Sequence, residues 1–156
     1  MRILTGQYER NIDDKNRIQL PSELRRRIDA ERDGAGFYVT FGEHPGTLSI
    51  FTEGMFEQIA ERTATEFIPG PESQLFERQF FGLAAYVEPD GQHRILLPER
   101  LKKKAGLQTE VFLVGQKFRI DIWNRAAFEQ SLGIDWEGDG WPKEWSKFLR
   151  SRPAVS

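Results

Sequence analysis

The sequence contains no cysteine and only two histidines, and both scarcities narrow the chemistry open to it. Without cysteine there can be no disulfide, no thiolate metal site and no cysteine nucleophile. His44 and His93 lack a histidine partner at metal-binding spacing, so we expect no metal site. The sequence also lacks a Gly-rich phosphate loop and a nucleophile elbow. We therefore expect no catalytic site and no cofactor.

Long apolar runs are missing too. No segment approaches the ~20 apolar residues that a membrane-spanning helix needs. Residues 1–7 become polar at once and lack the apolar stretch of a signal peptide. Hydrophobic residues still make up 38% of the chain and charged residues 29%, a balance that supports a core. We expect a cytoplasmic protein without a membrane partner.

An excess of positive charge is also absent, since the net charge of the 156 residues is -2. This argues against a nucleic-acid surface that covers the whole chain. The basic residues are unevenly distributed, however, and they outnumber the acidic ones in residues 1–27 and in residues 92–104. Any nucleic-acid site is therefore expected to be a local patch in these two segments.

The two basic segments belong to an internal repeat, which appears when Arg17 is aligned with Arg94. The matching pairs in the first block are Asp13 with Asp90, Ile18 with Ile95, Leu20 with Leu97, Pro21 with Pro98, and Leu24 with Leu101. A second block follows in the same order, and it pairs residues 50–51 with 122–123 and residues 56–58 with 128–130. We place the extra residues of the first copy in the loop 42–46. Two small copies of this kind are expected to pack on each other.

Each copy shows the same succession of expected elements. These are a strand (8–12; 85–88), a turn, a strand (17–20; 94–97), a short helix with proline as its first residue, a hairpin (37–41 with 47–51; 111–114 with 118–123) and a closing helix. The alternation of apolar and polar residues over 118–124 is typical of a half-buried strand.

Local sequence patterns also predict the structure of the first closing helix, of the segment that follows it and of the tail. In the first closing helix Phe56, Ile59, Ala60, Thr63 and Phe67 form one apolar stripe. Residues 69–71 end this helix, and a bridging helix is expected from about Glu72. The tail after Gly133 is rich in tryptophan, and Pro142 is expected to start a last short helix.

The repeated turns, Asp13–Arg17 and Asp90–Arg94, support two interpretations. Each aspartate can accept hydrogen bonds from its own turn or pair with the arginine, which would make the turn structural. Alternatively, the turns project Lys15 and the arginines outward, where arginine can bridge phosphates or bind guanine. Asn16 tolerates a left-handed backbone better than His93 does, so we expect a reshaped second turn. Gln92 stands where the first turn has Lys15, which lowers the expected phosphate affinity of the second turn.

Each repeat also carries a triple-basic run, Arg25-Arg26-Arg27 and Lys102-Lys103-Lys104. Three consecutive helical residues spread around most of the helix axis, so they cannot all face one ligand. We expect these runs to be largely solvated.

Together these motifs resemble the MraZ family. The resemblance is carried by the doubled Asp-to-Pro pattern (13–21 and 90–98), residues 105–107, residues 111–116 and the strand end 121–124, and it covers residues 5–133. MraZ proteins are bacterial regulators encoded at the head of the division and cell-wall gene cluster. The chain departs from the family pattern at Asn16 and His93, where the family has glycine, and in the pair Asp13-Asp14.

The resemblance implies an α+β fold in which two tandem AbrB-like swapped-hairpin half-units form an intramolecular pseudo-dimer, with short helices and a C-terminal tail. The implied divisions are a first repeat (5–68), a bridging helix (69–81), a second repeat (82–133) and the tail (134–156).

The resemblance also implies a function. It predicts a nucleoid-associated, ring-shaped homo-oligomer that binds double-stranded DNA at short direct repeats upstream of its own operon, with no small-molecule ligand. The DNA-binding residues would be Lys15, Asn16, Arg17, His93 and Arg94, with Asp13 and Asp90 holding the turns. The alternative is a ring-forming adaptor that presents its tail to a protein partner.

Overall fold

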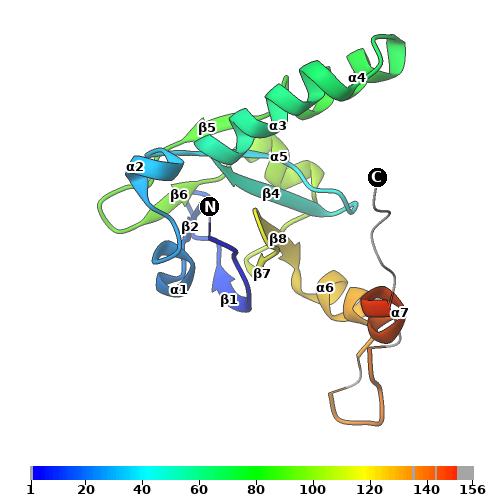
Figure 1. The fold of residues 1–156 in the computed structure, drawn as a ribbon. Helices are drawn as coiled ribbons and strands as arrows, with labels where there is room; N and C mark the ends of the chain where they lie inside the picture. The colour runs from blue at the N-terminus through cyan, green and yellow to red at the C-terminus, as the bar shows by residue number, and fades with distance from the viewer. Residues whose placement is uncertain (1, 135, 143, 151–156) are drawn as a thin grey trace. The chain divides into compact units, whose positions relative to one another are not determined.

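The computed structural model describes residues 2–134, 136–142 and 144–150 (Figure 1). The chain divides into two compact units, Met1–Arg125 and Ala126–Ser156. The first unit contains both Asp-to-Arg turns and every strand of the described residues. Any site built from the turns therefore belongs to the first unit.

The elements alternate along the chain between short strands and short helices. The strands are β1 (Gln7–Asn11), β2 (Arg17–Gln19), β3 (Phe37–Phe41), β4 (Thr47–Thr52), β5 (Ala85–Val87), β6 (Arg94–Leu96), β7 (Glu110–Gly115) and β8 (Ile120–Asn124). The helices are α1 (Ser22–Arg25), α2 (Ala30–Asp33), α3 (Glu53–Glu66), α4 (Pro71–Phe80), α5 (Glu99–Lys104), α6 (Arg125–Leu132) and α7 (Trp145–Arg150). The predicted α+β class with short helices is confirmed.

Six strands of the described residues form one antiparallel sheet in the order β1-β7-β8-β4-β3-β5. Strand β1 of the first copy pairs with the hairpin strand β7 of the second, and β5 of the second copy pairs with β3 of the first. The two hairpins join through β4 and β8. Exchanging the two copies leaves this order unchanged. Each hairpin therefore has its outer edge covered by a strand of the other copy, so that edge is not left unpaired.

Strands β2 and β6 form a separate antiparallel ribbon. At its centre Ile18 stands opposite Ile95, and both side chains are 0% exposed. They enter a core to which both copies contribute, including Leu4, Leu20, Leu24, Val39, Leu48, Ile50, Leu97, Leu101, Leu113, Ile120 and Ile122. Because the same apolar residues serve both copies, neither copy has a core of its own.

Strand β8 differs from its prediction. It is buried on both faces, and Asp121 is only 4% exposed. The Asp121 carboxylate accepts hydrogen bonds from the Ser49 hydroxyl (2.6 Å) and from Arg119 Nε (3.0 Å). The half-buried strand predicted from Phe118 is therefore wrong, because Asp121 and Trp123 on one face are covered as fully as Ile120 and Ile122 on the other. Asp121, the one charged residue of β8, can be buried because its carboxylate is paired with Arg119 and Ser49.

The closing helix of the first copy, α3, lies beside the bridging helix α4 (Figure 1). The Thr52 hydroxyl caps α3 by accepting a hydrogen bond from the backbone N–H of Met55 (3.2 Å). Aromatic rings connect the helices, with ring centroids 5.3 Å apart for Phe67 and Phe76 and 5.5 Å apart for Phe56 and Phe80. Two residues of the apolar stripe predicted for α3, Phe56 and Phe67, thus pack against α4, whereas Ala60 is exposed.

The first copy carries its extra residues in two places. Helix α2 has no counterpart in the second copy and is capped by Asp29, whose carboxylate accepts from the Glu31 N–H (2.9 Å). In the hairpins, Val39 pairs with Ile50, whereas Leu113 pairs with Ile122. Placing all the extra residues in the loop 42–46 is therefore wrong, since this alignment puts the larger part in the segment around α2.

The two prolines of the repeat also stand one residue earlier than predicted. Pro21 and Pro98 are the N-cap residues of α1 and α5, not the first helical residues. The missing N–H of proline is tolerated there for the same reason as at the first helical position, because no intrahelical bond is lost.

Candidate nucleic-acid interface

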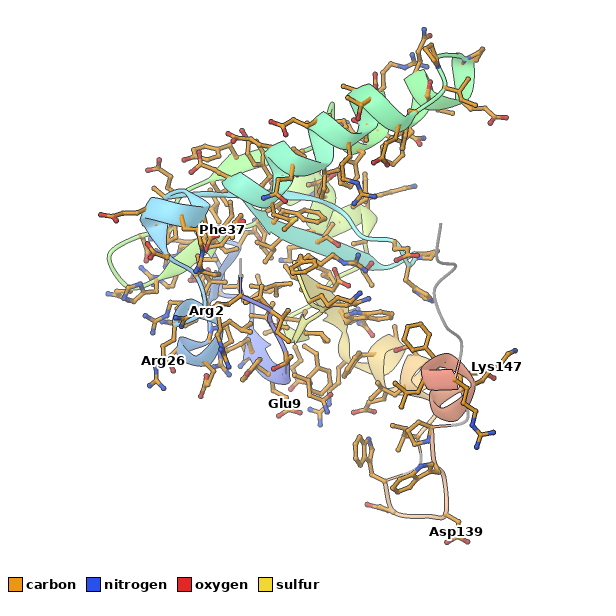
Figure 2. The ribbon with its side chains drawn as sticks, viewed as in Figure 1. Arg2, Glu9, Arg26, Phe37, Asp139 and Lys147 are labelled. Atoms are coloured by element: carbon orange, nitrogen blue, oxygen red, sulfur yellow. The ribbon has the colours of Figure 1, made fainter. Side chains whose placement is uncertain are left out.

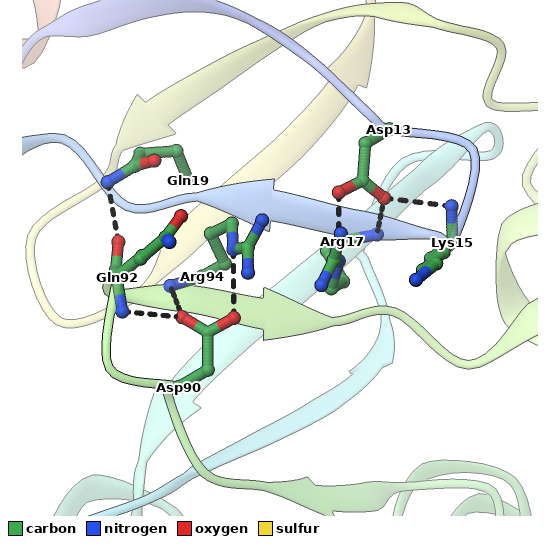
Figure 3. Close-up of polar contacts among 7 residues, drawn as sticks. All are labelled: Asp13, Lys15, Arg17, Gln19, Asp90, Gln92 and Arg94. Atoms are coloured by element: carbon green, nitrogen blue, oxygen red, sulfur yellow. Dashed lines mark hydrogen bonds and ion pairs between the residues drawn. The ribbon is translucent and has the colours of Figure 1, made fainter.

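The first turn, Asp13–Arg17, is organised by the Asp13 carboxylate (Figure 3). Asp13 Oδ1 accepts from the backbone N–H groups of Lys15 and Arg17, each at 2.9 Å. Asp13 Oδ2 accepts from Arg17 Nε at 2.9 Å, which forms an ion pair. Asn16 takes a left-handed φ of 60° and donates its N–H to the Asp13 carbonyl (3.0 Å). One aspartate thus fixes both the backbone of the turn and the direction of the arginine.

The second turn, Asp90–Arg94, repeats this geometry (Figure 3). Asp90 Oδ1 accepts from the N–H groups of Gln92 (2.9 Å) and Arg94 (3.0 Å), and Oδ2 accepts from Arg94 Nε (2.8 Å). His93 has a φ of 62°, within a few degrees of Asn16. The expected reshaping of this turn is wrong. The Asp90 bonds offset the cost of about 1–2 kcal/mol of a left-handed residue that is not glycine.

The two turns lie at opposite ends of the β2–β6 ribbon, and each bonds to the other copy. The N–H of Leu97 donates to the Asn16 carbonyl (2.7 Å), and the N–H of Leu20 donates to the His93 carbonyl (3.0 Å). Because Arg17 and Arg94 directly adjoin the inward-pointing Ile18 and Ile95, side-chain alternation brings both arginines onto one surface of the ribbon. Lys15 and His93 are exposed at the two ends of that surface.

Two residues that sequence reasoning missed also belong to this surface. Lys102 Nζ donates to Asn16 Oδ1 at 2.8 Å, so a side chain of helix α5 helps to hold the first turn in place. Gln19 Nε2 donates to the Gln92 carbonyl at 2.7 Å, so β2 holds the second turn. The register of the repeat gave one signal, since Lys102 aligns with Arg25 beside the same motif. No local pattern indicated the contact of Gln19.

The residues of each triple-basic run differ in their burial and in their contacts. Lys102 is half-buried against Asn16, whereas the exposed Lys103 pairs with Glu99 at 3.2 Å. On α1, Arg25 Nε donates to the Leu20 carbonyl (3.3 Å), and Arg26 is exposed (Figure 2). Each run therefore adds charge near the turns without acting as a single contact surface.

Acidification is expected to weaken both turns. The backbone N–H of Arg17, together with the N–H of Lys15 and the Arg17 side chain, holds the pKa of Asp13 below its ordinary value of 3.8. The backbone N–H of Arg94, together with that of Gln92 and the Arg94 side chain, lowers the pKa of Asp90 in the same way. The stabilisation is fully present above the unfolded value and is lost as the pH falls through the lower folded value.

Denaturant unfolding of Asp13→Asn should show this dependence. The variant is expected to be less stable than wild type at pH 7, with a difference that shrinks as the pH falls below about 4. Asp14→Asn is the matched control, because Asp14 is exposed and accepts no hydrogen bond within the described residues. An Asp13→Asn deficit of equal size at pH 7 and pH 3 would show that the charge of Asp13 does not hold the turn.

The described residues offer little for metal binding. They contain no group of three or more histidine, aspartate or glutamate side chains placed to hold a metal ion. His44 lies against the Trp123 ring, and its Nδ1 is 2.8 Å from the Pro45 carbonyl oxygen. No helix in the described part of the chain is long and apolar enough to cross a membrane.

Comparison with known proteins relates this chain to proteins named as transcriptional regulators. A family model described as "MraZ protein, putative antitoxin-like" matches residues 80–134. A protein of Finegoldia magna named "Transcriptional regulator MraZ" is 33% identical over 143 residues, which cover 88% of this chain and 96% of that protein. Proteins of the same name from Coxiella burnetii (134 residues; 85% of this chain and 86% of that protein) and Desulfosudis oleivorans (132 residues; 85% and 87%) are each 35% identical. None of these names is that of an enzyme.

Proposed function

The chain belongs to the MraZ family of transcriptional regulators, and on this basis we propose that it binds double-stranded DNA in a sequence-specific manner. Its targets would be short direct repeats upstream of its own operon, in the division and cell-wall gene cluster. The protein would act in the cytoplasm, on the nucleoid. The observation that carries this proposal is the pair of arginines held in equivalent geometry by Asp13 and Asp90.

The chemistry of these arginines suits a phosphate or a guanine. In both, Nε is bound to the aspartate, whereas the terminal guanidinium nitrogens make no hydrogen bond or ion pair within the described residues. The guanidinium is thereby oriented before DNA arrives, and two parallel N–H donors remain for an incoming acceptor. Lys15 adds a charge beside Arg17, which Gln92 does not do beside Arg94. Asn16 and His93 sit at the tips of the turns, within reach of the same ligand.

The finer description of the fold also belongs to this proposal. We propose that residues 5–68 and 82–133 are AbrB-like half-units fused into one pseudo-dimer, joined by 69–81 and followed by the tail 134–156. The exchange of β1 and β5 between the copies supports it, because each half-unit then completes the hairpin sheet of the other.

A gel shift over a salt series tests the function directly. The full chain is mixed with DNA from upstream of its own gene, and a matched unrelated duplex serves as the control. A shift is expected at low salt. If about three phosphates are neutralised, a fourfold rise in salt should weaken binding about fortyfold. No shift at low salt would contradict DNA binding and favour the adaptor alternative.

Self-assembly is the second part of the proposal, and it is supported by two complementary surfaces in the first unit. A cavity of about 610 Å³ beside α4 is lined by Phe41, Phe51, Phe76, Phe80 and Leu83. Arg100, Lys103 and Lys104 line the adjoining hollow. The turn between α3 and α4 exposes Phe67 (41%) and Ile68 (87%), flanked by Glu66 and Glu72. Insertion of this acidic, apolar tip into the cavity of a second copy is a heterologous contact, which closes into a ring when the rotation between successive copies divides a full turn.

Ile68→Asp is expected to break the assembly into smaller species, because it places a charge on the inserted tip. Sedimentation velocity of the full chain measures the change. Ile3→Asp is the matched control, since Ile3 is 53% exposed on the N-terminal segment, away from the tip and cavity residues in sequence. If Ile68→Asp and wild type sediment as the same species, the tip is not the contact.

A further inference from the structure

The β2–β6 ribbon has an outward face that packing does not account for. Ile18 and Ile95 point into the core, so the residues before and after them point away from it. In register, Arg17 stands opposite Leu96, and Gln19 stands opposite Arg94. The outward face is thus a two-by-two array with an arginine at each of two diagonal corners. Gln19 and Leu96 occupy the other two corners.

Both of these corners are open to solvent. Leu96 is 54% exposed, and Gln19 is also exposed. A single exposed leucine is ordinary on a protein surface. Here, however, the leucine shares a three-residue ribbon with two oriented guanidinium groups and an amide. One apolar group, one amide and two cations on one narrow face are the set of side chains that distinguish base pairs by their edges.

The dimensions of the face suit a DNA groove. Two paired strands lie about 4.8 Å apart, and the major groove is about 12 Å wide and admits a two-stranded β-ribbon. The turns at the two ends of the ribbon carry Lys15 and His93, at the places where phosphates would flank a ribbon in the groove. We infer that the outward face of the β2–β6 ribbon enters the major groove and that Gln19 and Leu96 read bases there. This inference rests on the DNA-binding function proposed above.

The side-chain amide of Gln19 is oriented so that it can bind an adenine. One N–H of its amide is donated to the Gln92 carbonyl (2.7 Å), which fixes the plane of the amide. The second N–H and Oε1 make no hydrogen bond within the described residues. A donor and an acceptor side by side match N7 and the N6 amino group of adenine. Orientation before binding lowers the entropy cost of forming both bonds.

Leu96 is suited to a thymine. It offers no hydrogen-bond donor or acceptor, and its neighbour across the ribbon is Arg17. The one apolar group on the major-groove edge of a base pair is the C5 methyl of thymine. Burying Leu96 against that methyl removes the exposed apolar surface from water, which cytosine or a purine at the same position would not achieve as well.

Because Gln19 and Leu96 differ, the ribbon should bind DNA in one orientation only. Gln19 and Leu96 occupy equivalent positions in the two copies of the repeat, so a ribbon with the same residue at both would read a sequence with twofold symmetry. With glutamine on one side and leucine on the other, the preferred sequence is not symmetric. Chains repeated along the DNA in one orientation would then require direct repeats rather than inverted ones.

Selection from a random double-stranded DNA library tests the inference. Wild type, Gln19→Ala and Leu96→Ala are each used as the full chain, and enriched sequences are compared. We expect wild type to enrich an asymmetric sequence. Gln19→Ala should lose the preference for adenine at one position, and Leu96→Ala should lose the preference for thymine at another, each by about fivefold or more. Both variants should still bind a fixed non-specific duplex, because no charge is changed.

Single-atom changes in the DNA then connect each side chain to its base. Replacing the selected thymine by uracil removes only the methyl and should weaken wild type but leave Leu96→Ala unchanged. Replacing the selected adenine by 7-deazaadenine removes N7 and should weaken wild type but leave Gln19→Ala unchanged. Leu96→Gln should shift the enriched sequence toward twofold symmetry.

The outcomes separate this inference from the function on which it rests. If wild type enriches a sequence and both alanine variants enrich the same one, the ribbon does not read bases, although the protein still binds DNA. If wild type enriches nothing and fails to shift any duplex, the DNA-binding function fails and the inference fails with it. Equal thermal unfolding of the three proteins would show that lost preference is not lost folding.

Discussion

Arg17→Ala is expected to remove most of the specific binding to promoter DNA while the protein stays folded. The guanidinium of Arg17 is held by Asp13, and its terminal nitrogens have no partner among the described residues, so its loss removes donors without exposing a core. An arginine that binds a base with two hydrogen bonds contributes about 1–3 kcal/mol, which corresponds to a loss of roughly fivefold to 150-fold in affinity. If Arg17 instead binds phosphate, binding should weaken on all sequences and the salt slope should fall by about one.

The measurement is a titration of labelled promoter DNA at several salt concentrations. Arg94→Ala should cost less than Arg17→Ala, because the second turn has Gln92 where the first has Lys15. Gln92→Lys should then strengthen binding, and Lys15→Gln should weaken it. Arg62→Ala is the matched control, since Arg62 is an exposed arginine on α3, outside both basic segments. If Arg17→Ala bound the promoter as tightly as wild type, the turns would not be the DNA contact.

Ile18→Ala is expected to destabilise the first unit by about 2–5 kcal/mol, the usual cost of removing a large buried side chain. Ile18 is 0% exposed and stands opposite Ile95 where the two copies meet, so the surrounding residues cannot close the cavity without moving both copies. Denaturant unfolding should show one transition for the strand-containing unit, displaced to lower denaturant, because both copies share one core.

Leu96→Ala is the matched control for this effect. It removes a large aliphatic residue from the same ribbon, but from a position that is 54% exposed, and surface changes of this kind stay within about 0.5 kcal/mol. Two separate transitions, or an Ile18→Ala loss no larger than that of Leu96→Ala, would contradict a core shared by the copies.

The repeat explains which features could be predicted from sequence. The Asp-to-Arg turns, the apolar stripe of α3 and the burial of Ile18 and Ile95 follow from local patterns that occur twice or recur with a fixed period. The reshaping expected at His93 does not occur, because the hydrogen bonds of Asp90 offset a residue preference of about 1–2 kcal/mol.

Other features depend on partners that are distant in sequence. The burial of Asp121 follows from Ser49 and from the central place of β8, and neither leaves a signal in residues 118–124. The contact between Lys102 and Asn16 likewise joins two copies whose relative placement no local pattern specifies. For the same reason, the surface that includes Gln19 and Leu96 could be recognised only once the register of β2 and β6 was known.

The pairing of β1 with β7 has a consequence for synthesis on the ribosome. Gln7–Asn11 is among the first segments to emerge, but its partner Glu110–Gly115 is made only near the end of the first unit. At about 5–20 residues per second, β1 waits several seconds for its partner. Pairing over such a sequence distance also slows folding after release. During that interval β1 lacks its partner, so β1 of one nascent chain could pair with β7 of a longer chain on a neighbouring ribosome.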